Sequence, residues 1–314
     1  MDAMRLHDKG RIYLIDGMDL GLLERTGTYV IDEEELTLIE TGPSPSVPYI
    51  KEGLSKLGFS LEQVKYIIVT HIHLDHAGGA GLLIQDCPNA KVVVHPKGAR
   101  HLASPERLIA GAQAVYGDTF DGLFAPIIAV PEDRLLIKED GETLEIGENC
   151  TLKFFHTPGH ANHHFSIYDP VSNGMFTGDT VGVRYAQLAH EGFGFYLPST
   201  SPNQFNPEAM HTAIQQMKDM KLDYIYYGHY GMTANVEQAL TMVANWLDVF
   251  VKEAKAVYES GESHEVLAAR LNELIRAALN AQQIPVDHPV YPIIELDTRV
   301  CSMGLLDYLQ KQDK

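Results

Sequence analysis

The chain has 314 residues, of which 45% are hydrophobic, and its 24 Lys and Arg against 42 Asp and Glu give a formal net charge of −18. That length can bury the core of one large domain, or of one domain with an appendage. The acidic balance and the lack of a basic run of five or more residues argue against nucleic acid as a partner. The sequence contains no stretch of 18 uninterrupted apolar residues, so we expect no membrane span.

The first two-thirds of the sequence alternates strand patterns with short helices. An acidic turn at 32–35 predicts a hairpin, and Asp75 is expected to cap a helix over 78–85. Asn206 and Pro207 predict the start of a helix over 207–220. Further helices are expected at 47–57 and within 99–125. The predicted strands are 11–16, 28–31, 36–40, 66–70, 91–95, 127–130, 143–146, 151–156, 163–168, 174–177 and 224–227.

The last 80 residues change character. Apolar residues recur at spacings of three and four over 240–257 and again over 267–278, which predicts two amphipathic helices arranged as a hairpin docked on the main domain. A third, shorter helix is expected over 302–312. We therefore predict a main domain at 1–234 and a C-terminal helical extension at 235–314.

The run His71-Ile72-His73-Leu74-Asp75-His76 follows a buried strand and precedes a helix. Alternate residues of an extended segment point the same way, so His71 and His73 can converge on one ion. Asp75 and His76 can turn toward a second ion. A single histidine is most simply a surface or core residue, but this grouping favours a metal site. Imidazole and carboxylate suit zinc, manganese or iron better than calcium.

Three further metal-binding residue types stand at predicted strand ends. His160, Asp179 and His229 each lie directly beside a glycine, which permits a close backbone approach or a sharp turn. Taken singly, each is weak evidence. Together with the histidine run, four strand ends offering such side chains favour one shared centre.

The set T-H-x-H-x-D-H-x-G-G at 70–79, T-P-G-H at 157–160, T-G-D at 177–179 and G-H at 228–229 resembles the metallo-β-lactamase fold superfamily. The resemblance implies an α/β fold, a four-layer αββα sandwich of two mixed β-sheets with outer helices, here with the C-terminal extension. Within it, the chain is similar to glyoxalase II-like thioesterases and N-acyl homoserine lactonases. By position, the resemblance assigns His71, His73 and His160 to a first metal, Asp75, His76 and His229 to a second, and Asp179 as the bridge.

The resemblance implies two divalent metal ions per chain, zinc first and manganese or iron as alternatives. Such ions, about 3.5–4 Å apart, hold a bridging hydroxide that attacks a carboxylic ester, lactone or thioester of a small molecule. Asp75 is expected to be catalytic, by orienting the hydroxide or passing its proton to the leaving group. His164 is expected to hydrogen-bond a ligand from behind. The histidines that fit no ligand position are read as structural or exposed: His95, His101, His156, His163, His190 and His211.

Other reactions stay open: a phosphoesterase or organophosphate-type hydrolase, an iron-dependent redox enzyme with similar ligands, or a binding protein with a relict site. The substrate also stays open. Many homoserine lactonases carry a tyrosine where this chain has Gly182, and either Tyr185 or the aromatic segment 193–205 could contact substrate or simply pack.

Cysteine usage bears on the compartment. Cys87, Cys150 and Cys301 are odd in number and form no C-x-x-C pair, so a disulfide framework is not expected. The first residues lack the apolar centre of a signal peptide. We therefore expect a cytoplasmic location, and a homodimer is a further hypothesis based only on the commonness of two-fold symmetry.

Overall fold

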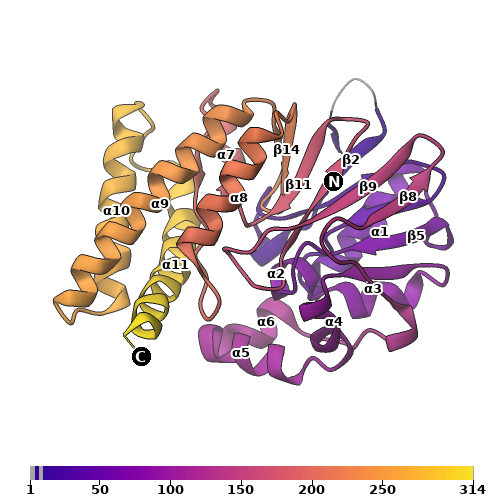
Figure 1. Cartoon of the computed structure of the whole chain (residues 1–314), viewed down its shortest axis with the longest axis horizontal. Helices are drawn as coiled ribbons and strands as arrows, with labels where there is room; N and C mark the ends of the chain where they lie inside the picture. Colours follow the sequence, from indigo (N-terminus) through magenta and orange to yellow (C-terminus); the bar gives the residue numbers. More distant parts are fainter. Residues whose placement is uncertain (1–3, 7–9, 314) are drawn as a thin grey trace. The chain divides into compact units, whose positions relative to one another are not determined.

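The computed structural model describes residues 4–6 and 10–313 (Figure 1). Their backbone divides into two units. Unit 1 comprises Met1–Thr157, His163–Gly178 and Leu222–Val236, and unit 2 comprises Pro158–Asn162, Asp179–Lys221 and Glu237–Lys314, each apart from the residues that are not described. The domains predicted at 1–234 and 235–314 stay a prediction.

Unit 1 holds two mixed β-sheets. In the first, the first three strand pairings are antiparallel and the last three are parallel. The acidic turn predicted at 32–35 does join an antiparallel hairpin, β3 with β4. The strands in spatial order are β1 (Met4–Arg5), β2 (Ile12–Asp16), β3 (Gly27–Ile31), β4 (Leu36–Ile39), β5 (Val64–Ile68), β6 (Lys91–Val94) and β7 (Leu135–Ile137).

The second sheet is antiparallel except where β11 pairs with β14. Strand β9 buries every second residue over its first half, as expected for a strand with one face toward a core. The strands in spatial order are β15 (Met232–Thr233), β14 (Tyr224–Tyr227), β11 (Gly174–Gly178), β10 (Phe165–Asp169), β9 (Cys150–His156) and β8 (Thr143–Gly147).

Aromatic side chains pack the two sheets against each other. The ring of Tyr29 on β3 lies edge-on to Phe176 on β11 and to Tyr226 on β14, with centroids 5.1 Å and 5.7 Å away. All three rings are almost completely buried. Edge-to-face rings at this spacing are favourable beyond the area that they bury. This core fixes the strand ends from which the candidate site is built.

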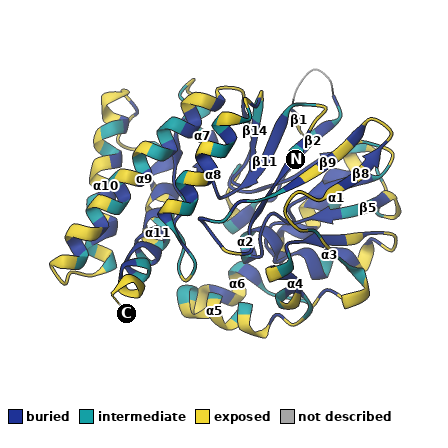
Figure 2. Ribbon diagram, viewed as in Figure 1, coloured by how far each residue is buried: buried dark blue, intermediate teal, exposed yellow. Residues whose placement is uncertain are grey.

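Helices cover the first sheet of unit 1. Ile50 and Leu54 of α1 and Leu83 of α3 share one buried cluster with Val30 and Leu38 of the sheet. In α1, Ile50 and Leu54 are buried while Tyr49 and Glu52 are exposed, the amphipathic pattern of a covering helix (Figure 2 colours each residue by its burial). The helices of this unit are α1 (Val47–Leu57), α2 (Leu74–Ala77), α3 (Ala80–Asp86), α4 (Pro96–Ala103), α5 (Glu106–Tyr116) and α6 (Phe120–Phe124).

Two local predictions in unit 1 are wrong. Residues 127–130 form no strand: the amide of Val130 donates to the main-chain oxygen of Leu102, and the carbonyl of Ile128 lies against Gly81 of α3. The apolar run is thus covered by helices. Asp75 caps no helix over 78–85, because α2 already begins at Leu74 with His73 as its N-terminal flanking residue.

Unit 2 is mostly helical, with one two-stranded sheet of β12 (Val183–Arg184) and β13 (Tyr196–Leu197). The Asn206 side chain accepts from the amide of Ala209 at 2.8 Å, which confirms the predicted cap. The third C-terminal helix begins at Val290 rather than at Ser302. The helices are α7 (Ala186–Ala189), α8 (Pro207–Asp219), α9 (Val236–Glu259), α10 (His264–Ala281) and α11 (Val290–Gln312).

All three cysteines are buried free thiols, as expected. Burial raises the pKa of each thiol to about 12, so they stay protonated near neutrality. Among the described residues, none of the helices combines the length and the apolar character that crossing a bilayer requires.

Candidate metal centre

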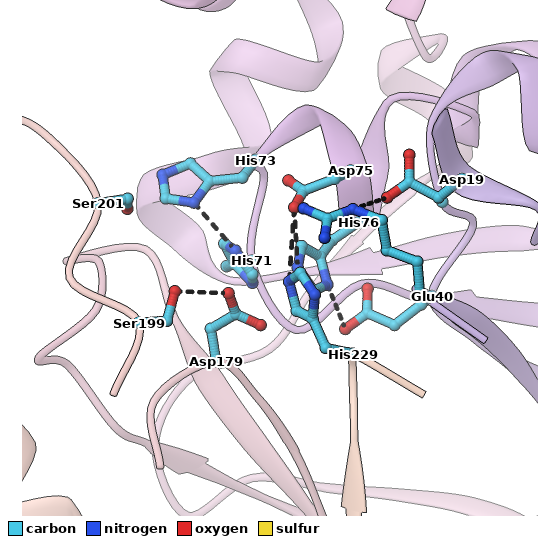
Figure 3. Close-up of polar contacts among 12 residues, drawn as sticks. Asp19, Glu40, His71, His73, Asp75, His76, Asp179, Ser199, Ser201 and His229 are labelled. Atoms are coloured by element: carbon cyan, nitrogen blue, oxygen red, sulfur yellow. Dashed lines mark hydrogen bonds and ion pairs between the residues drawn. The ribbon is translucent and has the colours of Figure 1, made fainter. Parts of the chain in front are cut away.

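Strand β5 leads directly into the histidine run of unit 1. His71 is fully buried, and its Nε2 lies 3.1 Å from Nδ1 of His73. The rings are nearly perpendicular, with an interplanar angle of 84°, and Figure 3 shows this nitrogen–nitrogen contact as a dashed line. Two imidazole nitrogens this close can share a hydrogen bond or point at one ion. The structure thus brings together the two residues of unit 1 that were predicted as ligands of a first metal.

The three residues predicted to bind the second metal, apart from the bridging Asp179, all lie in unit 1. Oδ2 of Asp75 lies 3.6 Å from Nε2 of His76 and 3.6 Å from Nε2 of His229. The donor atoms of these three residues lie within 4.8 Å of one another (Figure 3). Their chemistry, two imidazoles and one carboxylate, is that of a zinc, manganese or iron site.

Two glycines leave room for side chains of this site to lie against their backbone. A Cβ atom on Gly228 would lie 2.6 Å from Cε1 of His76, and one on Gly178 would lie 2.4 Å from Oγ1 of Thr70. Gly178 also has a left-handed φ of 47°, which glycine adopts without strain. The glycine beside His229 is therefore required by the packing of His76, as the sequence pattern indicated.

Glu40, at the end of β4, belongs to the site but was not predicted. Its Oε1 accepts from the hydroxyl of Thr70 and lies 3.6 Å from Nδ1 of His76. Oxygen and nitrogen atoms of Glu40, His71 and His76 also lie within 4.8 Å of one another. A buried carboxylate at Nδ1 orients the ring so that Nε2 faces Asp75 and His229. The position of Glu40 at a strand end beside Thr41-Gly42 is the signal that could have found it.

Asp19 and Arg25 form a buried ion pair in the loop between β2 and β3, with Oδ2 of Asp19 3.3 Å from Nε of Arg25. Burial raises the pKa of Asp19 to about 6, Arg25 opposes that rise, and the charge of Asp75 adds to it. The charge of Asp75, one of the three candidate ligands above, therefore influences the pKa of Asp19. Nothing in the sequence around residue 19 predicts this.

The two remaining predicted ligands lie together in unit 2. Nε2 of His160 is 3.8 Å from Oδ2 of Asp179. Gly159, before His160, has φ of 138°, and a Cβ there would lie 2.6 Å from Cα of Met210 in α8. Ser199 contacts both ligands: its hydroxyl donates to Asp179, and its main-chain oxygen accepts from Nδ1 of His160.

Two histidines of unit 1 that were not assigned as ligands lie beside the predicted ligands His71 and His73. The ring centroids of His164 and His71 are 5.0 Å apart, and Nδ1 of His164 is 3.1 Å from the hydroxyl oxygen of Thr157. The ring of His163 lies 5.4 Å from that of His73. His164 therefore packs behind a predicted ligand, while its expected hydrogen bond to one stays a prediction.

His95 and His156 form a pair elsewhere in unit 1. Nε2 of His95 is 3.0 Å from Nδ1 of His156, and Nδ1 of His95 accepts from the amide of Lys97 at the start of α4. Burial, with His156 and Lys97 adding to it, lowers the pKa of His95 to about 4. The pair has the structural role that the sequence suggested.

The residues expected near the substrate lie in unit 2. Tyr185 is buried, and its hydroxyl donates to Oδ2 of Asp297 in α11 at 3.0 Å. This contact gives Tyr185 a packing role. The segment 193–205 contains β13 and Ser199. Contact of either with a substrate stays a prediction.

Two mixed sheets with helices, and histidine–carboxylate groups at their strand ends, define a class of metal-binding α/β proteins. Residues 24–229 match the model of the Metallo-beta-lactamase superfamily, and the chain belongs to that superfamily. The metallo-beta-lactamase fold-containing protein ST1585 of Sulfurisphaera tokodaii is 27% identical over 210 residues, 66% of this chain and 73% of that protein. The cytoplasmic hydroxyacylglutathione hydrolase of Arabidopsis thaliana is 26% identical over 187 residues, 58% of this chain and 56% of that protein.

A solved structure supports the same fold. The metallo-beta-lactamase family protein TTHA1429 of Thermus thermophilus has a TM-score of 0.67 at 19% identity, covering 96% of this chain and 94% of that one. The predicted fold class, a sandwich of two mixed sheets with outer helices and a C-terminal helical region, is confirmed. The superfamily consists mostly of metal-dependent hydrolases, and His, Asp and Glu clusters able to hold metal are present here.

Proposed function

We propose that this chain hydrolyses a carboxylic ester, lactone or thioester of a small molecule at a dinuclear metal centre. Grouping the ligands of unit 1 with those of unit 2 in one centre follows the superfamily pattern of the sequence. The proposed ligands are His71, His73 and His160 for one ion, Asp75, His76 and His229 for the other, and Asp179 as the bridge.

One observation carries this proposal: the convergence of Asp75, His76 and His229. These residues come from segments about 150 positions apart in the chain, yet their donor atoms lie within 4.8 Å of one another. Burying two imidazoles beside a carboxylate costs free energy of desolvation, and a bound cation would offset that cost. The donor set fits zinc, manganese or iron.

Metal ions held by such ligands supply Lewis acidity, which brings the pKa of water toward about 7 and polarises a substrate carbonyl. The chain's own residues supply orientation and proton transfer. The side chain of Asp75 is 25% exposed, so its carboxylate can accept a proton from an attacking water and return it to a leaving group. Glu40 and Thr70 hold His76 and His71 in the orientation that such a site requires.

The substrate class rests on chemistry and on relatives. One relative is named as a hydroxyacylglutathione hydrolase, which favours a thioester. The ligand motifs of this chain resemble those of N-acyl homoserine lactonases equally well, which keeps a lactone as the other candidate.

Proton release tests the proposal. Zinc- or manganese-loaded protein is given S-lactoylglutathione, an N-acyl homoserine lactone and a phosphodiester in parallel, with Asp179→Ala as the inactive variant and Asp86→Asn, at an exposed salt bridge, as the control. Turnover of the thioester or the lactone that is lost only in Asp179→Ala is the expected result. Turnover of the phosphodiester alone would replace the proposal with a phosphoesterase. No turnover of any of the three, with metal bound, would reject it, and iron as the native metal would then favour a redox enzyme.

A further inference from the structure

Ser199 contacts two proposed ligands at once. Its hydroxyl donates to Oδ2 of Asp179 at 3.0 Å, and its main-chain oxygen is 2.9 Å from Nδ1 of His160 (Figure 3 shows Ser199 and Asp179). A carbonyl oxygen only accepts, so Nδ1 of His160 carries the proton and Nε2 keeps its lone pair. Nε2 is the atom that faces Asp179, at 3.8 Å from Oδ2. Ser199 therefore fixes both the tautomer of His160 and the rotamer of Asp179.

The loop that carries Ser199 is held by the C-terminal helix α11. The amide of Thr200 donates to Sγ of Cys301 at 3.4 Å, and its hydroxyl donates to the main-chain oxygen of Cys301 at 3.0 Å. The Cys301 thiol in turn lies 3.7 Å from the main-chain oxygen of Pro198, to which it donates. Both residues next to Ser199 are thus tied to one position of α11.

Gly304, one turn after Cys301, lets the helix come this close. A Cβ atom there would lie 1.9 Å from the main-chain oxygen of Thr200 and 2.5 Å from the carbonyl carbon of Ser201. Contacts of that length with backbone cannot be relieved by a side-chain rotation. Any larger residue at 304 must therefore move the loop or the helix.

We propose that Ser199 is a positioning residue of the metal centre, and that α11 holds it in place through Cys301 and Gly304. The inference rests on the proposed function in one respect: it takes His160 and Asp179 as ligands. It gives the C-terminal helical region a part in metal binding, although Cys301 is more than 100 residues from either ligand in sequence.

Zinc affinity of the full chain, measured by competition with a chromophoric chelator, tests the role of Ser199. Ser199→Ala removes the hydroxyl that holds the proposed bridging ligand Asp179, and we expect zinc to bind about 10-fold more weakly. The absorption spectrum of the cobalt-substituted protein should change with it, since that spectrum reports the ligand sphere. Ser199→Thr keeps the hydroxyl and should restore both. Wild-type affinity and spectrum in Ser199→Ala would overturn the assignment.

Gly304→Ala tests the role of α11, with Gly111→Ala as the matched control. Both replace a helical glycine by alanine, but a Cβ at Gly111 in α5 meets nothing within 4 Å. We expect weaker zinc binding in Gly304→Ala and wild-type zinc binding in Gly111→Ala. The helical circular dichroism of both variants should equal that of the wild type. A folded Gly304→Ala variant with wild-type zinc affinity would refute the proposal that α11 holds Ser199 in place.

A second variant guards against a folding failure. Cys301→Ala removes the sulfur that accepts from Thr200 and donates to Pro198 while adding no atoms, so it should fold and still weaken zinc binding. Wild-type zinc affinity in Cys301→Ala would also contradict the proposed role of α11 in holding Ser199. Failure of the proposed function shows in the wild-type chain itself, which would bind no zinc or would hydrolyse neither the thioester nor the lactone with metal bound. Failure of this inference instead leaves the zinc affinity of every variant at the wild-type value.

Discussion

The hydroxyl of Tyr29 on β3 lies 2.7 Å from the main-chain oxygen of Tyr227 and 2.7 Å from that of Gly231. Tyr29 belongs to one sheet, and the turn from Tyr227 to Gly231 follows the other and carries His229. One buried phenol therefore fastens a proposed ligand loop to the facing sheet.

Tyr29→Phe should lower the free energy of unfolding by about 1–2 kcal/mol, because it removes the one phenol hydrogen that these two carbonyl oxygens share, while the Gly231 oxygen keeps the amide of Tyr227 as a donor. Denaturant unfolding of the metal-free protein measures this. Tyr49→Phe serves as the control, since Tyr49 is exposed. Equal stability of Tyr29→Phe and wild type would show that the phenol does not fasten the turn.

Asp75→Asn should retain metal and lose turnover. The amide keeps an oxygen donor for the metal but cannot take up a proton near neutrality, so kcat should fall by at least about 100-fold. Steady-state kinetics and metal analysis of the same preparation check it. Undiminished turnover with both metals bound would remove Asp75 from proton transfer.

Glu40→Gln should weaken the second metal while leaving the fold intact. The neutral amide no longer favours a proton on Nδ1 of His76, so Nε2 becomes a poorer ligand, and zinc affinity should fall by about 10-fold. Chelator competition measures the affinity. Glu52→Gln, at an exposed pair with Lys56, is the control, and equal affinities in the two variants would argue against Glu40 as an orienting residue.

Acid should destabilise the chain through His95. Its pKa is lowered from 6.5 to about 4 in the folded state, so the unfolded state binds the proton first as the pH falls. The stabilisation is present above the unfolded pKa and is lost between it and the folded pKa, by on the order of 2–3 kcal/mol. Denaturant unfolding of metal-free protein at about pH 7 and about pH 4.5 measures it.

His95→Asn is the matched variant for that experiment, because asparagine can still cap α4 but does not titrate. Its stability should change less between the two pH values than that of the wild type. The same change in both proteins would assign the acid sensitivity to other groups.

The sequence predicted those features that depend on local pattern. Buried strands end beside His71, Asp179 and His229, and the adjoining glycines are needed for close packing, as at Gly228 against His76. Period-3.6 apolar spacing predicted α9 and α10. Each of these patterns lies within a few neighbouring residues, so a single sequence is enough to recognise it.

Features that depend on tertiary contact were missed. Glu40 and Asp19 are single carboxylates whose role appears only when β4 and the 17–26 loop come beside α2. The run 127–130 has the composition of a strand, but the amide of Val130 donates to the main-chain oxygen of Leu102 in α4 rather than to a neighbouring strand. Ser199 is one serine among several, and only its two contacts with His160 and Asp179 distinguish it.

The number of zinc ions bound per chain tests the central claim most directly. Elemental analysis of zinc-saturated, gel-filtered protein should give about two ions per chain in the wild type and about one in His229→Ala, because the second site loses one of its three ligands in unit 1. A folded wild-type chain that retains no zinc, manganese or iron would contradict the account.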